Sequence, residues 1–177
     1  MRVDEFDPQR VVEVLNRHQV EYVLVGGYAA QLYGARRPTY DIDITPSTTL
    51  ENLNCLSAAL RELGAGIRVD DLAEGLPFDC SAESLRGTRI LNLRTPAGDL
   101  DLTFVPAGFP EGYEGLVESA QAHTISGITI KVAALNDVIK SKTAAARPKD
   151  LDALPELLRI AGRDRHQDRD LDHGLDL

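Results

Sequence analysis

Residues 40–45, Tyr-Asp-Ile-Asp-Ile-Thr, alternate carboxylates with apolar side chains. Successive side chains of a β-strand point to opposite faces, so this alternation predicts a strand. Asp41 and Asp43 would share one face of it, while Ile42 and Ile44 would share the other. Two carboxylates this close repel each other unless a cation lies between them. Such a pair also occurs with no function on exposed sheet edges, so its meaning depends on what lies near it.

The composition is that of one globular domain. The chain has 177 residues, of which 43% are hydrophobic and 27% charged, typical values for a soluble protein. The net charge of −9 argues against nucleic-acid binding over the whole surface. We expect a cytoplasmic protein, because no run is long enough to cross a membrane and the N-terminus lacks the apolar core of a signal peptide. Cys55 and Cys80 have no metal-like spacing and are expected to be reduced.

Helix and strand signals alternate along most of the chain, which predicts an α/β (α+β) fold with a mixed sheet. We expect a core over residues 1–132, a small C-terminal helical part over 133–161, and a charged, disordered tail over 162–177. Residues 64–80 mix Gly, Asp and Pro, which indicates loop. Strands are expected near 22–25, 40–45, 89–94, 100–105, 121–125 and 128–131. Helices are expected after Asp7-Pro8, after Gly27, over 50–63 behind a cap at Thr48 or Thr49, over 81–86 and over 111–120.

A third carboxylate lies in 98–105, Gly-Asp-Leu-Asp-Leu-Thr-Phe-Val. Asp101 stands between two leucines in the strand body, whereas Asp99 adjoins the turn, so we favour Asp101 and leave a contribution of Asp99 open. Three carboxylates from two neighbouring strands could hold two Mg²⁺ ions about 3.5–4 Å apart, with Mn²⁺ as the alternative. Gly26 and Gly27 follow an apolar strand, where backbone amides could approach phosphate oxygens closely.

Three segments in order, VGGYAAQLYGARRPTYDIDI, GDLDLTF and KSKTAAARPKDLDAL, resemble the polymerase-β-like nucleotidyltransferase superfamily. More narrowly, they resemble the AbiEii/MenT-type toxins of bacterial toxin–antitoxin systems. The resemblance covers about residues 20–160 and implies the fold of that superfamily, with transfer of a nucleoside monophosphate from an NTP to an acceptor hydroxyl. The superfamily's usual Gly-Ser is Gly26-Gly27 here, so a hydroxyl that often contacts a nucleotide phosphate is missing. The chain is also shorter than many members.

The resemblance assigns roles to individual residues. Asp41, Asp43 and Asp101 would bind metal, and Asp101 would also act as general base for the acceptor hydroxyl. Lys142 lies on an apolar helix stripe, so it must extend to the surface, pair with an acid or reach a ligand; the resemblance makes it a catalytic residue that neutralises the triphosphate. The residues expected to contact the nucleotide or the acceptor are Gly26, Gly27, Arg36, Arg37, Lys142, Arg147 and Lys149.

Thr39 shares the face of Asp41 and Asp43 in the expected strand. One interpretation is a strand residue whose hydroxyl is satisfied locally. The other is a regulatory phosphorylation site, because a phosphate would place about two negative charges beside Asp41 and compete with the nucleotide for metal. In MenT-type relatives a hydroxyl residue near this position is phosphorylated, which would make the cognate antitoxin a kinase.

The resemblance further implies that the acceptor is the 3′ end of tRNA, whose modification would stop translation and growth. The expected partners are then an NTP, tRNA and an antitoxin protein, with no membrane partner. Three alternatives stay open: nucleotidylation of a protein, modification of an antibiotic hydroxyl, and a catalytically idle module whose carboxylates hold a structural cation or none. The sequence does not indicate the preferred NTP or the oligomeric state.

Overall fold

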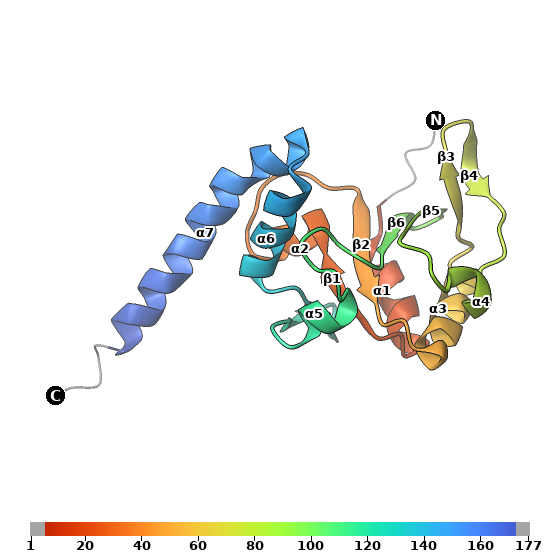
Figure 1. Ribbon diagram of the computed structural model, residues 1–177, viewed down its shortest axis with the longest axis horizontal. Helices are drawn as coiled ribbons and strands as arrows, with labels where there is room; N and C mark the ends of the chain where they lie inside the picture. Colours follow the sequence, from red (N-terminus) through yellow and green to blue (C-terminus); the bar gives the residue numbers. More distant parts are fainter. Residues whose placement is uncertain (1–5, 173–177) are drawn as a thin grey trace.

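The computed structural model describes residues 6–172, with side chains for residues 6–165. It contains helices and strands in alternation, as the sequence predicts (Figure 1). The helices are α1 Pro8–Arg17, α2 Gly26–Leu32, α3 Leu50–Glu62, α4 Ala82–Leu85, α5 Tyr113–Val117, α6 Leu135–Ala145 and α7 Pro148–Asp172. The strands are β1 Tyr22–Val25, β2 Asp41–Pro46, β3 Gly66–Val69, β4 Leu72–Leu76, β5 Ile90–Thr95, β6 Gly98–Thr103, β7 Gln121–Ile125 and β8 Ile128–Val132.

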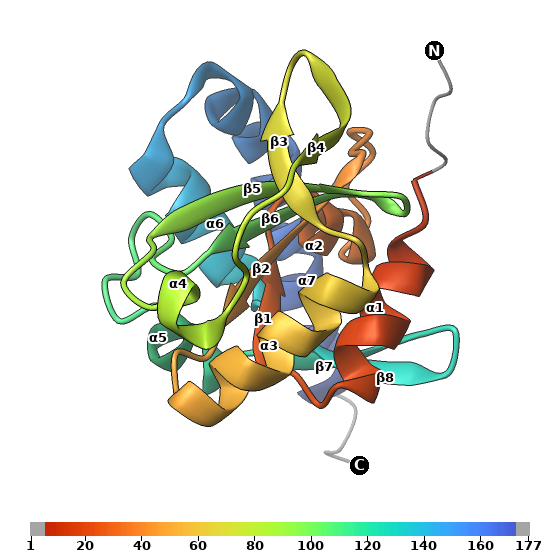
Figure 2. The ribbon, with the colours of Figure 1, turned by 90° about the vertical axis from the view of Figure 1, so that its right-hand side faces the viewer.

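The strands form one sheet in the order β4-β3-β5-β6-β2-β1-β8-β7. β2 pairs with β6 in parallel, and β1 pairs with β8 in parallel. The other neighbouring strands are antiparallel, which confirms the mixed sheet. Figure 2 shows α1 and α3 in front of the sheet and α6 and α7 behind it. The sheet is therefore a layer between two sets of helices.

The core lies on the α1/α3 side of the sheet. Ile42 and Ile44 of β2 and Leu100 and Leu102 of β6 are completely buried. Because side chains alternate along a strand, the aspartates between these residues must point to the opposite face. The helices contribute a further buried set, which comprises Val11, Val12, Val14, Leu15, Leu53, Leu56 and Leu60.

The helix-start signals in the sequence act as expected. The Asp7 carboxylate accepts the backbone N–H of Arg10 at 3.0 Å and caps α1. The Thr49 hydroxyl, rather than that of Thr48, accepts the N–H of Asn52 at 3.2 Å and caps α3. Each cap satisfies a backbone donor that the first helical turn leaves without an intrahelical partner.

The expectation of loop over residues 64–80 is wrong, because this segment contains the β3–β4 hairpin. Its glycines indicated loop, but they allow the two strands to approach closely. A Cβ on Gly66 would lie 2.9 Å from the Glu74 carbonyl oxygen, and Gly75 has a φ of +76°. The pairing register shifts between Ile67 and Val69, so the hairpin lacks the regular alternation that identifies a strand.

The structure also differs from the sequence at the C-terminal end. Residues 162–172, expected to be disordered, continue α7, and residues 173–177 lie outside the described part. Pro155 stands inside this helix. A helix already formed over its first turns extends through polar residues at little further cost. Within residues 6–172, no helix combines the length and the apolar character that spanning a membrane requires.

Asn52 connects α3 to the antiparallel pair β1 and β2, through Glu21 just before β1 and Ser47 just after β2. Its amide nitrogen donates to the Glu21 carbonyl at 2.9 Å and to the Ser47 carbonyl at 2.8 Å. Its amide oxygen accepts the Glu21 N–H at 2.7 Å. The residue is 3% exposed, so water cannot replace these bonds.

We predict that Asn52→Ala lowers the free energy of unfolding by about 2 kcal/mol, because it leaves the Ser47 carbonyl and the Glu21 N–H without their partner. Urea denaturation followed by circular dichroism measures the change. Asn54→Ala, at an exposed position on the same helix, is the matched control and should change stability by less than about 0.5 kcal/mol. Equal midpoints for the two variants would contradict the prediction.

Candidate active site

Three carboxylates meet on the face of the sheet opposite the core. The parallel register of β2 and β6 places Asp43 opposite Asp101 and Asp41 opposite Asp99. One oxygen from each of Asp41, Asp43 and Asp101 lies within 4.8 Å of the others. The structure thus brings together the three aspartates that the sequence singles out; we call them the acidic triad. Oxygen atoms at such separations suit a hard divalent cation.

The acidic triad is electrostatically unfavourable by itself. Burial, together with the charges of Asp41 and Asp101, raises the pKa of Asp43 to about 7 against the opposing influence of Lys149 and Lys142. Burial also raises the pKa of Asp101. Its Oδ1 is buried and accepts no hydrogen bond from the described residues, although a guanidinium nitrogen of Arg68 lies 3.1 Å away as an ion-pair partner. An incompletely paired cluster of this kind fits a divalent cation, which would favour the ionised form of every member.

The two glycines lie against this cluster. Gly26 has a φ of +72°, and a Cβ there would overlap the Asp43 carboxylate, so no other residue fits without rearrangement. A Cβ on Gly27 would lie 3.0 Å from the Thr39 hydroxyl oxygen. A serine at position 27 would therefore press on Thr39. The Thr39 hydroxyl occupies the space beside the glycine pair.

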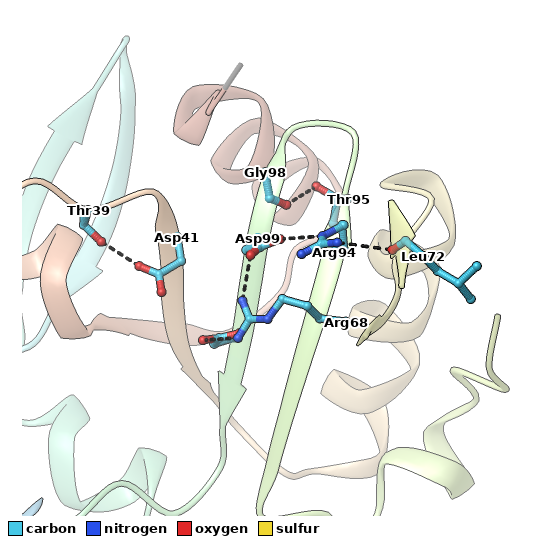
Figure 3. Close-up of polar contacts among 9 residues, drawn as sticks. Thr39, Asp41, Arg68, Leu72, Arg94, Thr95, Gly98 and Asp99 are labelled. Atoms are coloured by element: carbon cyan, nitrogen blue, oxygen red, sulfur yellow. Dashed lines mark hydrogen bonds and ion pairs between the residues drawn. The ribbon is translucent and has the colours of Figure 1, made fainter. Parts of the chain in front are cut away.

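Thr39 contacts one member of the triad. It precedes β2, and its hydroxyl donates to Asp41 Oδ1 at 2.6 Å (Figure 3). The hydroxyl is therefore satisfied locally, as the simpler interpretation of the sequence expects. The same contact places the hydroxyl oxygen directly beside a triad carboxylate.

Basic side chains from α6 and from the α6–α7 junction line the same cavity as the triad. Lys142 Nζ is 3.4 Å from Asp150 Oδ1, and Arg147 Nε is 2.6 Å from Asp150 Oδ2. The Asp150 side chain is only 2% exposed, so this buried carboxylate pairs with two cations that are more exposed than it is. Lys142 keeps 16% exposure and also lines the cavity, so it both pairs with an acid and faces the site.

The triad and these cations line a single cavity of about 730 Å³, within the usual range for small-molecule sites. Gly26, Gly27, Arg37 and Lys149 also line it. Arg37 donates to the Lys149 carbonyl at 3.1 Å. Arg36 is not among the lining residues; its backbone N–H lies 3.2 Å from a carboxylate oxygen of Glu156.

Sequence reasoning missed Arg68. This residue lies on β3 and donates to Asp99 Oδ2 at 2.9 Å and to Asp101 Oδ2 at 3.3 Å. Arg94 donates to the other oxygen of Asp99 at 3.2 Å (Figure 3). Both oxygens of Asp99 thus accept from arginines, which separates this residue from the triad. No local signal marks Arg68, because its segment has no clear strand pattern.

Comparisons with known proteins identify the fold. No protein-family model matches the sequence, and no curated protein matches it. A candidate nucleotidyltransferase from Thermotoga maritima has a similar structure, with 15% identity, coverage of 85% of this chain and 89% of that chain, and a TM-score of 0.53. The antibiotic-resistance factor ANT(2'')-Ia is also similar, with 19% identity, coverage of 93% and 94%, and a TM-score of 0.52. The chain has the polymerase-β-like nucleotidyltransferase fold that the sequence predicts.

Proposed function

We propose that the protein is a Mg²⁺-dependent nucleotidyltransferase that transfers a nucleoside monophosphate from an NTP to an acceptor hydroxyl. The observation that carries this proposal is that the acidic triad and a group of basic residues line the same cavity, close enough for Lys142 and Lys149 to act on the charge of Asp43. The fold, which is that of nucleotidyltransferases, supports it. Acidic and basic groups in one cavity suit a substrate whose triphosphate needs both bound cations and basic side chains.

The basic residues and the acidic triad would have different roles in this reaction. Lys142, with Arg147 and Lys149, would hold the β- and γ-phosphates and direct the α-phosphorus toward the triad. Asp41 and Asp43 would hold divalent metal ions, which when bound neutralise phosphate charge and lower the pKa of the acceptor hydroxyl. Asp101 would accept the proton of that hydroxyl. The acceptor oxygen forms a bond to the α-phosphorus, the bond to the bridging oxygen breaks, and pyrophosphate leaves with the electron pair.

For the acceptor, we propose the 3′ end of tRNA, within a growth-inhibiting toxin neutralised by an antitoxin. This narrower proposal rests on the resemblance to AbiEii/MenT-type toxins and on the local basic character of residues 131–150, which hold five basic and two acidic residues. Arg37 adds a further basic group to the cavity. A small-molecule hydroxyl is the second candidate, because the likeness to the antibiotic-resistance factor ANT(2'')-Ia spans 93% of this chain. Protein acceptors and an idle binding module are outcomes of the same test.

We predict that wild-type protein with Mg²⁺ transfers label from at least one α-³²P-NTP to tRNA, and that Asp41→Asn lowers the rate roughly 100-fold or more by removing a triad carboxylate. Parallel reactions contain total tRNA, protein extract or a set of antibiotics with free hydroxyl groups, and gels or chromatography identify the labelled acceptor. Asp71→Asn, at an exposed acid in the β3–β4 turn, should match wild type. Absence of transfer to every acceptor would exclude the enzymatic proposal.

The pKa of Asp43 gives a pH-dependent prediction for the metal-free protein. Its folded value of about 7 lies above the ordinary 3.8. Between these values the folded chain retains a proton that the unfolded chain has lost, so stability falls as pH rises. Asp43→Asn removes this loss. In EDTA at pH 8 the variant should be more stable than wild type by on the order of 3 kcal/mol, and the difference should shrink toward pH 5.

Urea denaturation at the two pH values measures this difference. Saturating Mg²⁺ at pH 8 should stabilise wild type but not the variant, because metal binding needs the ionised carboxylate. A difference that is the same at both pH values would contradict the predicted pKa shift.

We further propose that Thr39 is a regulatory phosphorylation site, which would suit a kinase-type antitoxin. The support is the contact between its hydroxyl and Asp41 at 2.6 Å, because a phosphate there would lie beside the triad.

We predict that Thr39→Glu lowers nucleotide transfer at least about tenfold, because a carboxylate beside Asp41 adds repulsion and competes for metal. Thr39→Val keeps the shape without the hydroxyl and should retain most of the activity. The transfer assay described above measures both variants. Full activity of Thr39→Glu would count against regulation at this position.

A further inference from the structure

Four charged side chains from three adjacent strands form a continuous series of ion pairs beside the acidic triad. We call Arg68, Arg94, Asp99 and Asp101 the arginine–aspartate network; its last member belongs also to the triad. Arg94 and Asp99 are cross-strand partners on β5 and β6. Arg68 reaches across from β3, beyond β5, to the same face of the sheet. Figure 3 shows Arg68 and Arg94 converging on Asp99.

Arg68 bridges the two aspartates of β6. One terminal nitrogen of its guanidinium is 2.9 Å from Asp99 Oδ2, and the other is 3.1 Å from Asp101 Oδ1. Arg68 keeps 25% and Asp101 14% of its side-chain exposure, so water screens the pair only in part. Within the described part of the chain, no other cation lies within ion-pair distance of Asp101.

Arg94 fixes the network from the other end. Its Nε donates to Asp99 Oδ1 at 3.2 Å, and a terminal nitrogen donates to the Leu72 carbonyl of β4, also at 3.2 Å. The bond to Arg94 therefore helps to hold Asp99 in position against Arg68. With one terminal nitrogen of its planar guanidinium on Asp99, Arg68 directs the other terminal nitrogen at Asp101.

We propose that Arg68 is a positioning residue that orients the Asp101 carboxylate toward the triad and limits the affinity of the triad for divalent cations. A fixed positive charge beside Asp101 opposes a second cation by Coulomb repulsion. The same contact fixes the direction of the carboxylate that would accept the acceptor's proton. The catalytic half of this inference rests on the proposed function, whereas the half that concerns cation affinity does not.

The test compares Arg68→Gln with wild type in Mn²⁺ binding, measured from the electron paramagnetic resonance signal of free Mn²⁺. Loss of the charge should tighten Mn²⁺ binding roughly three- to tenfold. In the transfer assay the same variant should lose about tenfold or more in kcat, because Asp101 is no longer oriented, with the KM for NTP changed less than about twofold. A purely structural role would instead weaken Mn²⁺ binding and lower stability.

Arg68→Lys provides a second variant, which keeps the charge but cannot bridge both aspartates. Its Mn²⁺ affinity should stay near that of wild type while kcat falls. Arg86→Gln removes an exposed arginine after α4 and serves as the matched control, with no change expected in either measurement. Urea denaturation identifies any variant that fails to fold, in which case the other position-68 variant decides the matter.

The outcomes separate this inference from the proposed function. Unchanged or weaker Mn²⁺ binding by Arg68→Gln would overturn the electrostatic half, and unchanged kcat in both position-68 variants would overturn the positioning half. If wild-type protein transfers no label but Arg68→Gln binds Mn²⁺ more tightly, the proposed function fails while the effect of Arg68 on cation affinity stands.

Discussion

The parallel pairing of β2 with β6 is the constraint on which the site depends. Its register places Asp43 opposite Asp101 on one face of the sheet, and Ile44 opposite Leu102 in the core. A slip of one residue would exchange the two faces of a strand, with its aspartates buried in the core and its isoleucines in the cavity. Burial of the apolar residues therefore fixes the distance between the carboxylates. The same hydrophobic packing that stabilises the fold assembles the acidic triad.

The basic residues around the triad pair mainly with other acids, so they neutralise the triad only in part. Asp99 holds Arg68 and Arg94 on the sheet side, and Asp150 holds Lys142 and Arg147 on the helix side. Each of these cations is already partnered by an acid outside Asp41 and Asp43. The raised pKa of Asp43 follows from this arrangement, because the nearby cations offset burial and repulsion only in part. Such a site favours an added divalent cation over further protein contacts.

The sequence predicts those parts of the fold that depend on residues close together in the chain. The alternation around Asp41 and Asp101, the caps at Asp7 and Thr49 and the Gly26 turn each follow from side-chain periodicity or backbone freedom within a few residues. The β3–β4 hairpin does not, because its glycines serve a close approach between strands rather than a turn. Arg68 could not be assigned, since its partners lie more than thirty residues away in the chain. The same reason applies to Arg36 and Arg37, because which of two adjacent arginines lines the cavity is a tertiary property.

A chain with a net charge of −9 can still bind a polyanionic substrate. The charges that line the cavity, rather than the total charge of the protein, decide what the cavity attracts. Lys142 keeps a small exposed fraction directed into the cavity, while its partner Asp150 is almost fully buried. A ligand in the cavity would therefore meet the ammonium group of Lys142 before the carboxylate of Asp150. The triad is only partly neutralised by the nearby cations, so it favours a metal ion rather than phosphate. A nucleoside triphosphate with bound metal suits both the acidic triad and the basic residues. A free anion suits only the basic residues, and a free cation suits only the triad.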